Sequence, residues 1–386
     1  MAHTRREILG GMATLCVSPS LAMVQPTAKK KNRSALDSTN LRASLTQVLG
    51  LMPHRPAPEY KTLESTKLDA GWRHKIEFIA EPPDPLFDAP QDVIRAYLFV
   101  PNQATKQPVP AIVAIHQDGP QSHIGKSEPA GLAGDKNLHY GLELFERGYV
   151  VICPDRFGHA ERRRVTPNDI TSIDADRDDG LLNHRVGQLL LRGRTAFGKE
   201  TYDLMVATDV LMTLDYVDKG RIGAIGHSAG GHNLVFFMFG DSRIRAGVSS
   251  CGLFSILHFY SESAAKKRLA AFALPGLASV GDSADYLGLL SPRPVLLTRG
   301  LWEWGQTGDE ATFSKKHVAE TREIEAHART FYERDSASQN LQTIYFDENG
   351  GNHDFPPNVR EQTYAWLDQN LKHTPPSKTP LAGYRG

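Results

Sequence analysis

Hydrophobic residues from Val109 onward form short unbroken runs that alternate with stretches of helical spacing. The runs are 109–116, 149–155, 221–227, 244–250, 293–300 and 341–348, and the helical stretches are 137–147, 200–218, 229–239, 311–334 and 358–372. A strand without polar alternation suits a parallel sheet that helices cover on both faces. This order of elements therefore predicts an α/β fold with a doubly wound, mostly parallel sheet.

The residues before Val109 follow a different pattern. Residues 72–80 and 92–101 alternate apolar and polar side chains, as half-buried antiparallel strands do. Residues 41–51 have helical spacing, and a proline-rich connection at 53–58 follows them. We therefore expect N-terminal antiparallel strands next to the parallel sheet.

One folded domain is expected to span residues 41–373, followed by a tail at 374–386. A chain of 386 residues is long enough for one large α/β domain with extensions. Residues 255–291 interrupt the alternation of strands and helices. They lie where an insertion would cap the carboxyl edge of the sheet.

The first 24 residues differ from the rest of the chain. The pair Arg5 and Arg6 precedes a modestly apolar segment diluted by glycine, and Ser20 to Ala22 offers a small-x-small cleavage site. This pattern resembles a bacterial twin-arginine signal peptide and predicts an exported, periplasmic or extracellular protein. The alternative is an amphipathic first helix of the domain. The polar residues 25–40 are expected to form a linker.

Composition narrows the possible partners. The chain is 40% hydrophobic and 23% charged, which is typical of a globular protein. Its 44 basic and 44 acidic residues give no net field that would attract nucleic acid or an anionic membrane. Beyond the signal, no apolar run reaches the roughly 18 residues of a membrane span. The basic run at 161–165 is interpreted as a solvated loop, and Cys153 and Cys251 are too few for a disulfide framework.

The segment Gly226-His227-Ser228-Ala229-Gly230 matches the pattern G-x-S-x-G between a predicted strand and a predicted helix. An abrupt turn at this point brings its flanks together, and glycine at both second positions removes Cβ clashes. The turn would project the Ser228 hydroxyl above the sheet. The amide of Ala229, at the start of the helix, would point into the same space and stabilise an oxyanion.

A second oxyanion donor is expected in the loop after the first central strand. The backbone amide of Gln117 has the matching position, and His116 is expected to hold that loop rather than to act in catalysis.

A serine hydroxyl is a poor nucleophile and needs a base that an acid orients. His353 lies in a glycine-rich loop after the last predicted strand and is the candidate base. Glu303 follows the preceding strand and is the candidate acid, with Asp309 as the alternative. The chain order of serine, acid and histidine is the one expected for this type of fold.

Four segments carry a resemblance to a known family: HQDG at 116–119, GHSAGGHN at 226–233, SSCG at 249–252 and GNHDFPPNVRE at 351–361. The chain resembles the α/β-hydrolase superfamily, in its dienelactone-hydrolase-like and acetyl-xylan-esterase-like branch, from about Leu41 to Leu371.

This resemblance implies a catalytic triad at Ser228, His353 and Glu303. The family acid is usually aspartate, so Glu303 is a departure. Dienelactone hydrolases proper have cysteine at the position of Ser228, and their substrate is therefore not implied.

Three functional classes remain open. The first is a secreted carboxylic-ester hydrolase, with acylated carbohydrates as candidate substrates. The second is a serine peptidase of the prolyl-oligopeptidase kind, and the third is a non-catalytic binding protein. The ordered set of serine, acid and histidine favours a hydrolase over a binding protein.

No cofactor or metal is expected, because His227 and His232 form no recognisable ligand set. Two further groups of residues have two interpretations each. The side chains of Asp155, Arg156 and His159 would bind a polar substrate or form salt bridges within their loop. The indoles of Trp302 and Trp304 would form an aromatic wall for the substrate or pack the loop around Glu303.

Overall fold

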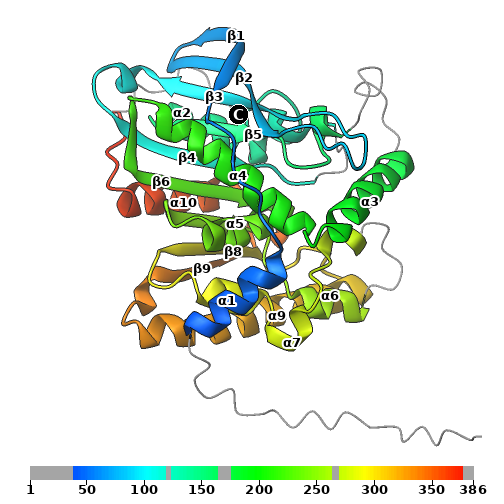
Figure 1. Cartoon of the computed structure of the whole chain (residues 1–386). Coiled ribbons are helices and arrows are strands. Elements are labelled where there is room, and N and C mark those ends of the chain that lie inside the picture. The colour runs from blue at the N-terminus through cyan, green and yellow to red at the C-terminus, as the bar shows by residue number, and fades with distance from the viewer. Residues whose placement is uncertain (1–37, 119–122, 164–174, 263–268, 377–386) are drawn as a thin grey trace, which may run out of the picture. The chain divides into compact units, whose positions relative to one another are not determined.

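The computed structural model describes residues 38–118, 123–163, 175–262 and 269–376 (Figure 1). The predicted signal peptide, most of the predicted linker and the last ten residues lie outside this part. Within it, nine strands form a single sheet in the order β1-β2-β3-β5-β4-β6-β7-β8-β9. None of the described helices is long and apolar enough to cross a membrane.

The larger part of the sheet is parallel, as predicted. Its strands are β4 (Val109–Ile115), β5 (Val150–Pro154), β6 (Val217–His227), β7 (Ile244–Ser250), β8 (Val295–Gly300) and β9 (Leu341–Phe346). Every residue of β4, β5 and β8 is buried. This burial on both faces explains why the sequence shows unbroken apolar runs there.

The N-terminal strands are antiparallel, also as predicted. They are β1 (Tyr60–Leu68), β2 (Gly71–Glu81) and β3 (Asp92–Pro101), and β3 joins the parallel part by pairing with β5. Strand β1 was not predicted. Among the described strands it pairs only with β2, and most of its side chains are exposed, so its sequence carries no alternating pattern.

Alternate residues of the central strands point to two separate hydrophobic clusters. In β4, the side chains of Ala111, Val113 and Ile115 belong to one cluster, and those of Ile112 and Ala114 belong to the other. The first cluster includes residues of α1 (Ser38–Leu49), α4 (Ala196–Thr213), α5 (Ala229–Gly240), α8 (Ser283–Gly288) and α9 (Gly308–Arg334). The second includes residues of α2 (Tyr140–Glu146) and α10 (Pro357–Asn370). Helices therefore cover both faces of the sheet.

The segment 255–291 is only partly an insertion. It contains α6 (Ile256–Glu262), η6 (Leu269–Phe272), α7 (Leu277–Val280) and α8. Tyr286 of α8 is fully buried, and its hydroxyl donates a hydrogen bond to the Leu45 carbonyl of α1 at 2.8 Å. The end of the segment therefore belongs to the core. Helix α3 (Ala175–Leu191), which precedes α4, was not predicted.

The interpretation of the basic run at 161–165 as a solvated loop is wrong for its described residues. Arg162 is only 4% exposed, and its guanidinium pairs with Asp92 at 2.6 Å and with Asp203 at 2.8 Å. Glu161 pairs with Lys126 at 2.8 Å. The sequence alone suggests a solvated loop because the ion-pair partners of the run lie on β3, on α4 and in another loop, at distant positions along the chain.

We expect the Arg162→Met variant to lower the free energy of unfolding by about 3 kcal/mol, because it removes a buried cation and leaves Asp92 and Asp203 with Lys199 as their remaining charged partner. Urea denaturation measures this change. The matched control is Lys61→Met, which removes an exposed charge 4.0 Å from Glu77 and should cost about 0–1 kcal/mol. Equal effects of the two substitutions would show that the buried pairs do not stabilise the fold.

Candidate active site

Ser228 lies in a sharp turn between the end of β6 and the start of α5. Its backbone has φ 53° and ψ −123°, a combination that costs a non-glycine residue about 1–3 kcal/mol. Two hydrogen bonds hold the turn: the Ser228 amide donates to the Ser250 carbonyl at 2.8 Å, and the His232 amide donates to the Ser228 carbonyl at 3.0 Å. The turn is therefore strained, and the structure around it fixes its conformation.

The two glycines of the G-x-S-x-G pattern lie where no side chain fits. A Cβ atom on Gly230 would overlap the carbonyl oxygens of Ile115 and His116, at the end of β4. A Cβ atom on Gly226 would overlap the carbonyl of Gly230 across the turn. Close backbone contact across this turn thus accounts for the glycine spacing.

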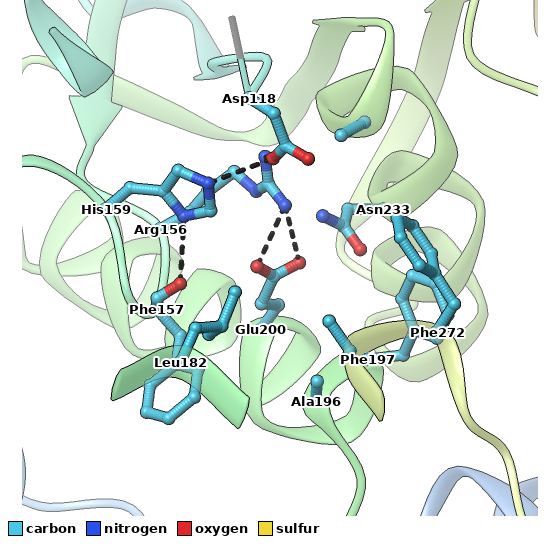
Figure 2. A pocket seen from close by; sticks show the side chains of 12 residues that line it. Asp118, Arg156, Phe157, His159, Leu182, Ala196, Phe197, Glu200, Asn233 and Phe272 are labelled. Atoms are coloured by element: carbon cyan, nitrogen blue, oxygen red, sulfur yellow. Dashed lines mark hydrogen bonds and ion pairs between the residues drawn. The ribbon is translucent and has the colours of Figure 1, made fainter. Parts of the chain in front are cut away.

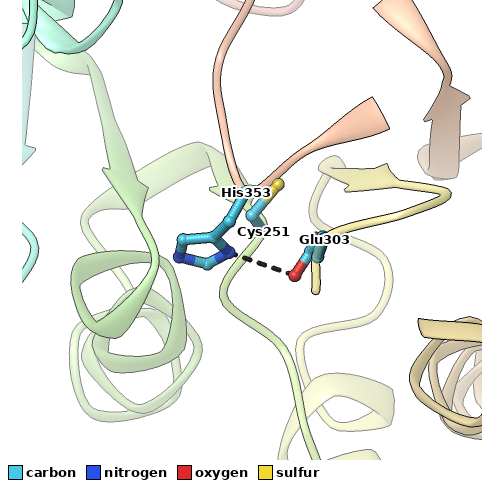
Figure 3. A group of neighbouring side chains, drawn as sticks. All are labelled: Cys251, Glu303 and His353. Atoms are coloured by element: carbon cyan, nitrogen blue, oxygen red, sulfur yellow. Dashed lines mark hydrogen bonds and ion pairs between the residues drawn. The ribbon is translucent and has the colours of Figure 1, made fainter. Parts of the chain in front are cut away.

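His353 and Glu303 are hydrogen-bonded to each other, with His353 Nδ1 3.0 Å from Glu303 Oε2 (Figure 3). Glu303 follows β8 and is buried, whereas the side chain of His353, after β9, is 37% exposed. The Arg299 guanidinium lies 2.8 Å from the Glu303 carboxylate. Burial alone would raise the pKa of Glu303, but the charge of Arg299 and the bond to His353 outweigh burial and hold this pKa well below its usual value.

This charge state determines which nitrogen of His353 carries the proton. An ionised Glu303 only accepts hydrogen bonds, so we assign the proton to His353 Nδ1 and the lone pair to Nε2. The ring of His353 lies beside that of His227, the residue before Ser228, with 4.9 Å between the ring centroids. Within the described part of the chain, no hydrogen bond joins the Ser228 hydroxyl to His353. Such bonds are often long or absent before a substrate binds.

The loop after β4 is held by His116. The Arg156 amide donates to His116 Nε2 at 3.0 Å, so His116 Nδ1 carries the proton and donates to the Gln117 carbonyl at 2.7 Å. Burial and the nearby Arg156 charge hold the pKa of His116 well below its usual value. His116 therefore has the structural role that was expected. Among the described residues, neither the Gln117 amide nor the Ala229 amide has a hydrogen-bond partner.

The sequences of known proteins match part of this chain. A model of the prolyl oligopeptidase family matches residues 189–275, which include the Ser228 turn. YtaP of Bacillus subtilis (strain 168), a candidate hydrolase by name, is 28% identical over 204 residues, which are 53% of this chain and 63% of that protein. The chain thus matches less than two thirds of the length of this relative.

Similarity to solved structures extends over more of the chain. A candidate acetyl xylan esterase from Bacteroides fragilis NCTC 9343 has a TM-score of 0.66 and 17% identity over 87% of both chains. A glucuronoyl esterase from Solibacter usitatus has a TM-score of 0.55 and 14% identity, over 86% of this chain and 91% of that one. The chain has the α/β-hydrolase fold. The resemblance that the sequence suggested is confirmed at this level.

Two further histidines near Ser228 in this α/β-hydrolase fold make only local contacts among the described residues. His232 is fully buried and stacks on Phe254, with 4.0 Å between the ring centroids. Burial lowers the pKa of His232 to about 3, so the ring is neutral. His227 Nδ1 lies 3.0 Å from the Ser250 hydroxyl. The described ring contacts of His232 are with phenylalanine rings, so His232 packs within the core.

The two tryptophans that flank Glu303 differ in their exposure and in their contacts. Trp304 is 49% exposed, and its ring lies nearly parallel to that of His353 with 6.5 Å between centroids. Trp302 donates its amide to the Gly351 carbonyl at 2.8 Å, and the Lys315 ammonium lies 5.7 Å from its ring. Trp302 therefore packs the loop, whereas Trp304 is the indole that a substrate at His353 would reach.

The polar residues after β5 form salt bridges, which was one of the two interpretations of their sequence. Asp155 pairs with Lys126 at 2.6 Å, and Arg156 pairs with Glu200 at 2.9 Å. His159 Nε2 lies 3.0 Å from Asp118. Arg156 and His159 also line a small cavity beside Ala229 (Figure 2), so these residues are not confined to salt bridges.

Asp309, the alternative acid, lies in the first turn of α9 and is exposed. Among the interactions of the described residues, none joins Asp309 to His353, whose Nδ1 contacts Glu303 instead. Arg299, which the sequence analysis missed, holds Glu303 in place. An arginine one residue before the end of a fully buried strand was the available signal.

Cys251 also lies at this site. Its sulfur and ligand atoms of Glu303 and His353 are all within 4.8 Å of one another, which is a spacing that a metal ion could use (Figure 3). Arg299 already neutralises Glu303, however, and its charge would repel a cation there. The arrangement therefore suits orientation of His353 better than metal binding.

We expect the Gly230→Ala variant to lose about 3 kcal/mol of stability or more, because the added Cβ atom has no space against the end of β4. The matched control is Gly187→Ala in α3, where a Cβ atom meets nothing within 4 Å. Alanine should stabilise that helix by about 0.5–1 kcal/mol. Thermal denaturation compares the two, and a stable Gly230→Ala variant would contradict the described turn.

Proposed function

We propose that this α/β-hydrolase is an exported serine hydrolase that cleaves carboxylic esters, with acylated carbohydrates as its substrates. The observation that supports this function most strongly is the strained Ser228 turn at the same edge of the sheet as a hydrogen-bonded histidine–carboxylate pair. A serine with a purely structural role would require neither a strained turn nor a histidine–carboxylate pair at the same edge of the sheet. The exported location rests on the N-terminal sequence pattern alone.

In the proposed reaction, His353 Nε2 accepts the proton of the Ser228 hydroxyl while the Ser228 oxygen attacks the ester carbonyl. Glu303 stabilises the imidazolium that forms. The ester C–O bond then breaks, and the leaving alcohol takes the proton from His353. Water attacks the acyl-enzyme with His353 as the base again, which releases the carboxylic acid and restores Ser228.

The tetrahedral intermediates carry a negative charge on the former carbonyl oxygen. The amides of Gln117 and Ala229 are the proposed donors to this oxygen, because they follow the adjacent strands β4 and β6 and are free of other partners among the described residues. Ala229 also begins the 12-residue helix α5, whose amino end favours an anion. Each donor should contribute about 3 kcal/mol to transition-state stabilisation.

A saccharide is a reasonable leaving alcohol because of Trp304. Its exposed indole lies beside His353, where the alcohol must be protonated, and it offers a flat apolar surface for one face of a sugar ring. Solved structures that share the fold include esterases named for acetyl xylan and for glucuronoyl substrates.

A serine peptidase is the second candidate, because the prolyl oligopeptidase family model matches residues 189–275. The same serine and histidine would attack an amide. An ester hydrolase is favoured because the esterases resemble the chain over 86–87% of its length, whereas the peptidase match covers one segment. Rates on acetylated xylo-oligosaccharides and on peptide p-nitroanilides separate the two functions.

We expect Ser228→Ala to lower kcat for p-nitrophenyl acetate by at least about 10⁴-fold, because no other group can form the acyl-enzyme. Glu303→Gln should lower it by about 10³ to 10⁴-fold, because the amide no longer fixes His353 in the productive tautomer. Steady-state kinetics on purified, folded variants measure both effects.

The matched control for Glu303→Gln is Asp309→Asn, which removes the alternative acid and should leave kcat unchanged. A large loss in Asp309→Asn with little loss in Glu303→Gln would reassign the acid. Full activity of Ser228→Ala would reject the serine mechanism.

A further inference from the structure

A small cavity lies on the opposite side of Ser228 from His353 and Glu303. Strand β6, which leads to Ser228, lies between β4 and β7 in the sheet. The cavity residues Asp118 and Arg156 follow β4 and β5, whereas Glu303 and His353 follow β8 and β9. Ala229, directly after the serine, lines the cavity itself.

The position of the cavity relative to Ser228 and His353 indicates which part of an ester substrate would occupy it. If the proposed function is correct, the leaving alcohol lies near His353, which must protonate it. The acyl chain then extends from Ser228 in the other direction, past Ala229 and into the cavity. The enclosed space is about 20 Å³, which is room for about one or two heavy atoms.

One wall of this cavity carries a buried amide without a partner. Asn233 lies one helical turn after Ala229 and is only 2% exposed. Both its Nδ2 and its Oδ1 are buried and have no hydrogen-bond partner among the described residues. Figure 2 shows this amide facing Arg156 and Glu200 across the cavity. A buried amide left unpaired costs about 1–3 kcal/mol, so its place here calls for a ligand or a bound water.

The chemistry of the cavity favours a neutral ligand. A hydroxyl group both donates and accepts hydrogen bonds, so one hydroxyl can satisfy Oδ1 and Nδ2 of Asn233. A carboxylate is disfavoured, because Arg156 is already paired with Asp118 at 2.7 Å and with Glu200 at 2.9 Å. Phe197 and Phe272 contribute apolar surface that suits a methylene group.

We propose that this cavity binds the acyl group and that Asn233 selects short acyl chains that carry a neutral hydroxyl, such as a glycolyl group. The size of the cavity limits the length of the chain, and the Asn233 amide distinguishes a hydroxyl from a methyl group at the same place. Asn233 is thus a specificity-determining residue and takes no part in the bond-breaking steps.

The test compares p-nitrophenyl glycolate with p-nitrophenyl propionate, whose acyl groups have the same number of heavy atoms. The ratio of their kcat/KM values is measured for the wild type and for Asn233→Leu, which has a similar volume and no polar side-chain atom. We expect the glycolate-to-propionate ratio to fall at least about tenfold in the variant. Intrinsic reactivity of the two esters cancels in this comparison.

The matched control is Asn358→Leu, an exposed asparagine in α10, which should leave the ratio unchanged. Asn233→Leu should also melt at the same temperature as the wild type or higher, because an unpaired buried amide is removed. An unchanged ratio would overturn the proposal. Combined with a lower melting temperature, it would show that Asn233 binds a structural water.

If the wild type hydrolyses neither ester, the proposed function fails, and the cavity is then tested by binding alone. Glycolamide, but not propionamide, should raise the melting temperature of the wild type and not that of Asn233→Leu. Absence of this difference would overturn the proposed subsite.

Discussion

The strained backbone at Ser228 is the constraint on which the rest of the site depends. A serine with φ 53° persists because β6 must turn directly into α5, and because backbone atoms of β4 pack against Gly230 without space for a side chain. The same contact brings the end of β4 next to the start of α5, so the amides of Gln117 and Ala229 follow neighbouring strand ends. The turn thus positions the proposed nucleophile and its proposed oxyanion donors with a single local conformation.

A second constraint acts on the side of Ser228 where β8 and β9 end. Arg299, almost fully buried at the end of β8, holds Glu303 ionised, and Glu303 in turn orients His353. Burying a carboxylate is costly unless a cation and hydrogen bonds compensate. Here the compensation makes Glu303 a hydrogen-bond acceptor only, so His353 keeps its proton on Nδ1 and its lone pair on Nε2. Glu303, where the family that the chain resembles usually has aspartate, is thus paired with a buried arginine.

The sequence predicted those features that depend on local pattern. Unbroken apolar runs indicated the parallel strands, and the predicted strand ends gave Ser228, Glu303 and His353 as candidate residues. The polar strand β1, the buried Arg162 and the cavity at Asn233 could not be predicted, since each depends on partners from distant segments. An asparagine within an apolar helix gives no sign of whether its amide is paired, because only the packed structure shows which atoms surround it.

The central claim is that the Ser228 hydroxyl is an activated nucleophile. Labelling of the folded protein with a fluorophosphonate, followed by peptide mass spectrometry, tests this claim most directly because it requires no knowledge of the substrate. The account predicts one adduct per chain on Ser228, and loss of labelling when the protein is denatured first. No adduct on the folded protein, or an adduct on a different serine, would contradict it.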